Sequence, residues 1–184
     1  MKRLYRLVFV GAFLCIGCAP TFKQLANPQS DALVVGYLGT DKSPCYLDYL
    51  KYKQTLPGGK EKNSSMKLYG PIFYAEFSDI PSSIKLNQFG GHPRVFSSVD
   101  RCDIRFPDDA FKFDIKESGK IYFLGAIRAI QKNPNIHNAD SVHLEVLEFP
   151  DESEVLQLLL PSVSDTKWES VVKSEIKSLG NPAK

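Results

Sequence analysis

Residues 110–116, AFKFDIK, show the clearest strand pattern in the chain and decide the fold class that we predict. Positions 111, 113 and 115 are apolar, whereas positions 112, 114 and 116 are charged. Successive side chains of a strand point to opposite faces, so this alternation predicts a sheet with one buried face and one face in water.

Other segments carry similar signals, and turn-forming residues separate them. The expected strands are 32–38, 45–52, 71–77, 94–99, 121–130 and 141–149, and the expected turns or loops are 56–65, 87–93, 106–109, 117–120 and 132–140. The long apolar run 121–130 suits a central strand, and in 141–149 the alternation directs Val142, Leu144 and Val146 inward. About seven or eight short strands of this kind predict a mainly β protein, an antiparallel β-sandwich of the immunoglobulin-like or transthyretin-like type. An open barrel would give the same pattern.

One turn adds a family resemblance. The sequence Gly119-Lys120-Ile121-Tyr122 resembles the tyrosine corner of immunoglobulin-like domains.

After residue 150 the pattern changes to helical spacing, which predicts a C-terminal helical tail. Asp151 with Glu154 matches a capping box, and we expect Pro161 to end that first helix. A second box, Thr166 with Glu169, would start a helix whose apolar stripe is Trp168, Val171, Val172, Ile176 and Leu179. We expect Trp168 to pack against the β body, although an exposed stripe would instead indicate a partner-binding helix.

The first residues have the pattern of an export signal. Lys2, Arg3 and Arg6 precede the apolar run 7–16, which is too short to span a bilayer. Residues 14–18, LCIGC, resemble the lipobox of bacterial lipoproteins, with Cys15 at a position where that family usually has Leu. The resemblance implies that the sulfur of Cys18 carries a diacylglycerol with fatty acids such as palmitate, that a peptidase cleaves before Cys18, and that the lipid anchors the chain in a membrane. Ala19 after the cysteine, rather than Asp, favours the outer membrane.

The predicted cleavage before Cys18 divides the chain into segments and changes its net charge. We expect a signal peptide (1–17), a lipidated tether (18–31), a β-sandwich domain (32–150) and C-terminal helices (151–184). Removing the leader lowers the Lys and Arg count from 23 to 20 against 21 Asp and Glu, so the net charge falls from +2 to −1. The basic character therefore belongs to the leader, and we expect no nucleic-acid partner.

Two of the four cysteines are left once Cys15 departs and Cys18 takes lipid. Cys45 and Cys102 form an even pair in an oxidising compartment, which predicts a disulfide between them. Two free thiols are the alternative. Neither residue has a second ligand at zinc-binding spacing.

No known catalytic motif is present in the sequence. His92, His137 and His143 are not at metal-binding spacing, and we expect no metal and no cofactor. The dense tyrosine cluster Tyr46, Tyr49 and Tyr52 is a candidate contact surface.

These observations favour a non-catalytic, lipid-anchored envelope protein that binds an envelope partner or has a structural role. The alternative is an enzyme or small-ligand-binding protein whose site is built from loops around His92, Asp100 and His137.

Overall fold

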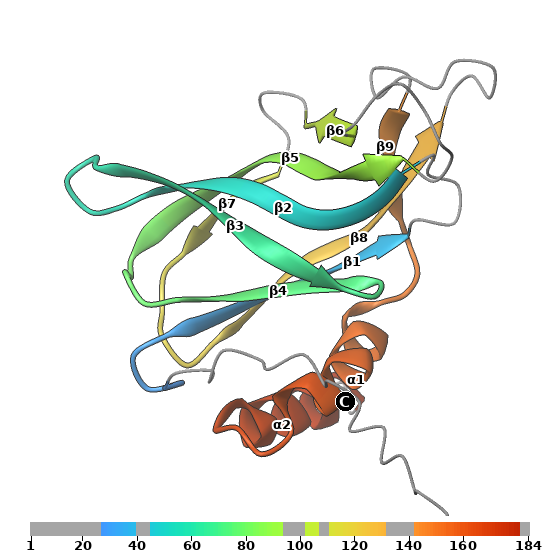
Figure 1. The fold of residues 1–184 in the computed structure, drawn as a ribbon. Coiled ribbons are helices and arrows are strands. Elements are labelled where there is room, and N and C mark those ends of the chain that lie inside the picture. Colours follow the sequence, from blue (N-terminus) through green and yellow to red (C-terminus); the bar gives the residue numbers. More distant parts are fainter. Residues whose placement is uncertain (1–26, 40–44, 94–101, 107–110, 132–141, 181–184) are drawn as a thin grey trace, which may run out of the picture.

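The computed structural model describes residues 27–39, 45–93, 102–106, 111–131 and 142–180. This part of the chain forms nine strands followed by two helices (Figure 1). The strands are β1 (Ala32–Gly39), β2 (Cys45–Thr55), β3 (Glu61–Tyr69), β4 (Ile72–Phe77), β5 (Ser82–Pro93), β6 (Cys102–Arg105), β7 (Lys112–Ile115), β8 (Ile121–Gln131) and β9 (Val142–Leu147). The helices are α1 (Glu152–Val163) and α2 (Trp168–Gly180). The prediction of a mainly β protein with a C-terminal helical part is confirmed.

The strands form two sheets that meet along β3. The strands are hydrogen-bonded in one continuous order, β6-β5-β2-β3-β4-β1-β8-β9 with β7 on β5, and β3 divides it into an outer sheet (β6, β7, β5, β2 and β3) and a helix-side sheet (β4, β1, β8 and β9). The end of β3 joins them, because Leu68 and Tyr69 pair with β4 whereas the rest of β3 pairs with β2. The sequence had suggested a wholly antiparallel sandwich. This was wrong for one pair of strands, because β1 runs parallel to β8. A parallel pair needs a long crossover, and here the chain makes the whole outer sheet between its two members.

The space between the two sheets holds the main hydrophobic core. Leu50 and Phe89 face it from the outer sheet, while Val34 and Phe73 face it from the helix-side sheet. The rings of Phe73 and Phe89 meet edge to face, with centroids 6.2 Å apart. Burial of these apolar side chains supplies the main driving force for bringing the sheets together.

A second core lies on the other side of the helix-side sheet, beneath α1 and α2. Leu33 and Val35 of β1 point toward the helices, so β1 is buried on both faces and is apolar at almost every position. Trp168 is fully buried in this core, and its indole N–H donates to the carboxylate of Glu76 on β4. The prediction that Trp168 packs against the body is confirmed, and the molecule has three layers (Figure 1).

Two stretches expected to be loops are instead strands. β3 starts at Glu61, inside the expected loop 56–65, and β5 continues through 87–93 to Pro93. The glycines that suggested a loop allow close packing: a side chain at Gly90 would collide with the ring of Tyr49, and one at Gly91 with the backbone of β2. Glycine in a strand often marks such a close approach. The expected strand 94–99 lies outside the described residues.

The helix boundaries also differ from expectation. Asp151 and Glu154 form the predicted capping box, but α1 continues past Pro161 to Val163. The fully buried Val163 anchors this last turn in the second core, which compensates for the backbone N–H that proline lacks. At α2 the expected box of Thr166 and Glu169 is not formed: the Glu169 carboxylate accepts from the backbone N–H of Asp165, and the Thr166 hydroxyl accepts from the backbone N–H of Trp168.

The inward assignment of Val146 is wrong, and Tyr122 has a specific contact with the turn before it. Val146 is 71% exposed, because β9 is at the edge of the helix-side sheet, although Leu144 does pack against the main core. The Tyr122 hydroxyl accepts hydrogen bonds from the backbone N–H groups of Lys116 and Glu117, each at 2.9 Å. This contact fixes the turn between β7 and β8.

Candidate functional site

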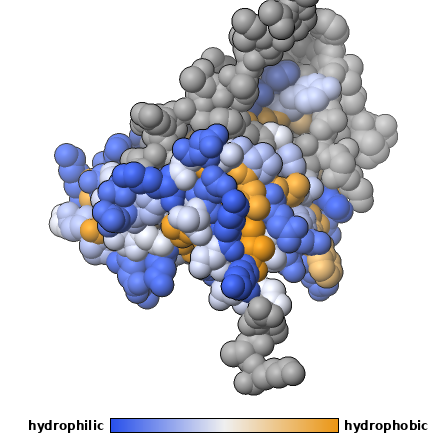
Figure 2. Space-filling model, turned by 90° about the horizontal axis from the view of Figure 1, so that it is seen from below, coloured by the Kyte–Doolittle hydropathy of each residue, from blue (hydrophilic) through white to orange (hydrophobic). Residues whose placement is uncertain are grey.

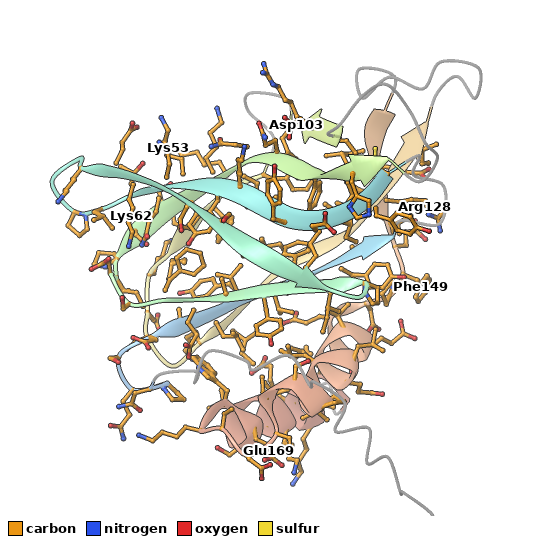
Figure 3. The ribbon with its side chains drawn as sticks, viewed as in Figure 1. Lys53, Lys62, Asp103, Arg128, Phe149 and Glu169 are labelled. Atoms are coloured by element: carbon orange, nitrogen blue, oxygen red, sulfur yellow. The ribbon has the colours of Figure 1, made fainter. Side chains whose placement is uncertain are left out.

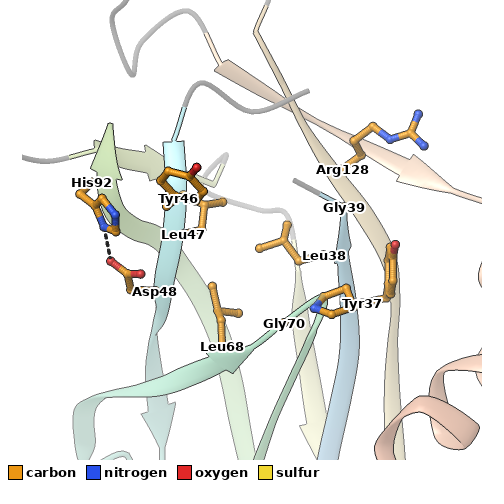
Figure 4. A pocket seen from close by; sticks show the side chains of 11 residues that line it. Tyr37, Leu38, Gly39, Tyr46, Leu47, Asp48, Leu68, Gly70, His92 and Arg128 are labelled. Carbon is orange, nitrogen blue, oxygen red and sulfur yellow. Dashed lines mark hydrogen bonds and ion pairs between the residues drawn. The ribbon is translucent and has the colours of Figure 1, made fainter. Parts of the chain in front are cut away.

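An open pocket of about 830 Å³ lies at one end of the sandwich, between the two sheets (Figure 4). It is formed where β1 and β8 end and where β2 begins. Its lining is Tyr37, Leu38, Gly39, Tyr46, Leu47, Asp48, Leu68, Gly70, Pro71, His92 and Arg128. Pockets of this size accommodate small ligands in many proteins.

The polar wall of the pocket comes from the outer sheet. Tyr46 on β2 pairs with His92 on β5, so the two side chains share a face, and their ring centroids are 5.3 Å apart. Asp48 is two residues along β2, and its Oδ2 lies 2.9 Å from Nδ1 of His92. The carboxylate fixes the orientation of the imidazole and leaves its other nitrogen available. All three side chains are partly open to solvent; that of Tyr46 is 49% exposed.

The floor of the pocket is apolar and continuous with the main core. Leu38, Leu47 and Leu68 point into the gap from β1, β2 and β3 (Figure 4). Leu38 is buried in the main core, and Leu47 and Leu68 pack against it. A ligand in the pocket would therefore contact leucine side chains below and polar groups at the rim.

The opposite wall comes from the helix-side sheet. Tyr37 and Arg128 lie across the gap from the His92–Asp48 pair (Figure 4). Arg128 pairs with Gly39, and the start of its side chain covers this glycine, since a Cβ at Gly39 would lie 3.5 Å from Cγ of Arg128. The pocket thus has a carboxylate and an imidazole on one side, and on the other Tyr37 and the start of the Arg128 side chain, whose guanidinium points away from the gap (Figure 4).

The groups that line the pocket could bind a ligand, and one pair of them could also take part in proton transfer. An imidazole oriented by a carboxylate can move a proton; among the described residues that line the pocket, none is a Ser, Thr or Cys. Within the described ranges, no three His, Cys, Asp or Glu side chains are grouped as they would be around a metal ion.

The sequence identified only part of this site. His92 is in the pocket, but Asp100 and His137, its expected partners, lie outside the described residues. The tyrosine cluster does not form one surface: Tyr46 is exposed at the rim, Tyr49 covers Gly90, and Tyr52 is buried against Phe77.

Three residues of the site were missed, namely Asp48, Tyr37 and Arg128. Asp48 and His92 are far apart in the sequence and meet only through the pairing of β2 with β5. The i, i+2 spacing of Tyr46 and Asp48 was the available signal, since it places both on one face of a strand.

The cysteines and the N-terminal segment are only partly described. Cys18 lies outside the described residues. Cys45, the first residue of β2, is buried and does not carry a free thiol, whereas the side chain of Cys102, the first residue of β6, is not described. Their pairing therefore stays a prediction. Neither described helix has the length and apolar character needed to cross a bilayer.

Comparison with known proteins gives little further information. No family model matches the chain, and no curated protein matches it. A solved structure of a leucine-rich repeat protein from Bacteroides thetaiotaomicron VPI-5482 is similar over 54% of this chain, with 14% identity and a TM-score of 0.36. The match spans only 12% of that protein.

Proposed function

We propose that this chain is a lipid-anchored protein of the bacterial envelope, most simply the outer membrane, whose β body binds a ligand without catalysis. The anchor is supported by the basic start, the short apolar run and the lipobox-like sequence ending at Cys18. Two or three acyl chains on one cysteine would hold the protein stably, because a single chain gives only marginal binding.

The anchor is tested by feeding expressing cells radiolabelled palmitate. The wild-type chain is expected to take up label, and Cys18→Ala is expected to take up none. Cys15→Ala serves as the matched control, since it alters a nearby cysteine that is removed with the leader. Label on Cys18→Ala would refute the anchor.

We infer further that the β body is an immunoglobulin-like sandwich. Support comes from the Tyr122 hydroxyl, which bonds to the backbone of Lys116 and Glu117 as the tyrosine corner of that family would.

The pocket at the end of the sandwich carries the binding part of the proposal. Its leucine floor and its rim of Tyr46, Asp48, His92 and Arg128 combine apolar area with a few directed polar groups. Such a combination is typical of small-molecule sites. The ligand expected here is small, with an apolar or planar face and hydrogen-bonding groups at one edge.

A thermal-shift screen of disaccharides and short peptides tests the binding role. A ligand at a hundred times its dissociation constant stabilises the folded state by about 2.7 kcal/mol, which is a shift of several degrees. Tyr46→Ala and His92→Ala should abolish the shift for any such ligand. Lys62→Ala is the control, because Lys62 lies at the far end of the strands (Figure 3). A shift that survives both pocket variants would place the site elsewhere.

A second candidate function is favoured by one observation, the 2.9 Å contact between Asp48 and His92. An imidazole held in this way could act as a general base in an enzyme. Hydrolysis of p-nitrophenyl acetate that is lost in His92→Ala and Asp48→Asn, but kept in Lys62→Ala, would support it over simple binding.

A further inference from the structure

A second surface hollow lies where β9 meets α1, and it shares no lining residue with the pocket described above. This groove has a volume of about 690 Å³ and is lined by Phe149, Pro150, Glu154, Gln157 and Leu158. Phe149 is 69% exposed and Leu158 is 48% exposed. Figure 3 shows Phe149 at the side of the molecule where the sheet approaches α1. Two large exposed apolar side chains that adjoin one another offer a small contact surface for a partner.

Apolar side chains also reach the surface elsewhere on the helical side. Figure 2, which views this side, shows hydrophobic atoms gathered in a band between hydrophilic ones. Leu179 on α2 is exposed as well, at 39%, but it does not line the groove. The groove at Phe149 and Leu158 differs because its lining also includes the carboxylate of Glu154.

The chain segment that contains the groove is acidic. The sequence from 142 to 166 contains no Lys or Arg, and its acidic residues are Glu145, Glu148, Asp151, Glu152, Glu154 and Asp165. Burial and then the neighbouring charge of Glu175 on α2 raise the pKa of the Glu152 carboxyl, with a smaller contribution from Asp151. The crowding of carboxylates therefore extends from α1 to α2.

We propose that this groove binds a segment of another protein that carries an apolar side chain flanked by Lys or Arg. The apolar residue would insert between Phe149 and Leu158, and the basic residues would meet Glu148 and Glu154. Buried apolar anchors supply most of the affinity of such contacts, while complementary charges supply orientation and speed of association.

The same charges disfavour the other occupants of an apolar groove. In a symmetric pair of copies, each acidic groove would face the other, and like charges would repel. An anionic lipid surface would be repelled for the same reason. A protein segment that is both basic and apolar complements the acidic residues beside the groove and its apolar lining.

The test uses the full mature chain, held by its lipid in phosphatidylcholine nanodiscs, with empty nanodiscs subtracted. The probe is a fluorescein-labelled peptide of sequence KKLKFK, followed by fluorescence anisotropy. Leu158→Ser and Phe149→Ser are each expected to weaken binding about tenfold, equivalent to roughly 1.4 kcal/mol. Leu179→Ser is the matched control and should bind as the wild type does.

Charge is tested separately with Glu148→Lys, which should weaken binding several-fold and flatten its dependence on salt. Glu117→Lys, an exposed change on the β7–β8 turn, is the control. Equal binding of the peptide EELEFE, or equal loss in Leu179→Ser, would overturn the proposal.

Two further results would also overturn it. One is protection of residues 149–158 from hydrogen exchange when phosphatidylglycerol replaces phosphatidylcholine. The other is a dimer, seen by light scattering, that Leu158→Ser dissociates.

Discussion

Replacing Gly36 by alanine tests directly how tightly the ring of Phe73 packs over β1 in the main core. Gly36 lies in the middle of β1 and pairs with Phe73 of β4, whose ring lies over it. An added Cβ would be 2.3 Å from Cζ of Phe73 and within 3 Å of two further ring atoms. Ordinary carbon contacts are about 3.5–4.0 Å, so something must move by more than 1 Å.

The ring has little room to move, because Phe73 is fully buried and packs against Phe89. Overpacking of this kind typically costs about 1–3 kcal/mol. The backbone at Gly36 is not left-handed, so the cost is steric alone. Gly39→Ala on the same strand is the control: its Cβ would meet Arg128 at 3.5 Å, and it should be neutral or stabilising by up to about 1 kcal/mol.

The assay is urea unfolding followed by far-ultraviolet circular dichroism and by the fluorescence of Trp168, the single tryptophan. Gly36→Ala combined with Phe73→Leu should be more stable than the sum of the single changes implies, by about 1 kcal/mol or more. Additivity within about 0.5 kcal/mol would refute the steric argument. So would equal effects of Gly36→Ala and Gly39→Ala.

Three more predictions use the same unfolding measurement. Tyr122→Phe should cost about 1 kcal/mol, because two backbone N–H groups lose their acceptor, and an unchanged midpoint would show that water replaces the hydroxyl fully. Trp168→Phe should cost about 1–3 kcal/mol, since it leaves a cavity and removes the donor to Glu76; a smaller cost would mean that the helices are only loosely docked. Glu152→Gln should stabilise the protein near neutral pH and have no effect well below the ordinary pKa of the carboxyl. Burial and then Glu175 raise the pKa of Glu152, so its contribution to stability is present at low pH and is lost as the pH rises through the raised value. A variant less stable than the wild type at neutral pH would contradict this.

Local patterns predicted the elements but not all of their neighbours. The alternation in 110–116 and the apolar runs 32–38 and 121–130 identified strands, because burial on one or both faces leaves a periodic trace. Residues 87–93 were misread because glycine signals a loop and a close backbone approach equally well. Only the ring of Tyr49, placed over Gly90 by strand pairing, decides between them.

The pocket residues show the same limit of local sequence patterns more strongly than the strands do. His92 could be singled out as a polar residue beside glycines, but its partner Asp48 could not, since β2 and β5 pair over a long sequence separation. Pro161 is a further example. Proline usually ends a helix, yet burial of Val163 outweighs that preference here.

The parallel pairing of β1 with β8 bears on how the chain acquires its structure. β1 is the first described strand to be synthesised, and one of its two neighbours, β8, comes only after the complete outer sheet. Contacts this distant in sequence slow folding, because the chain must close a long loop before they form. We therefore expect the chain to stay open until Gln131 has emerged. Late closure of this kind would suit the export across a membrane that we propose for this chain.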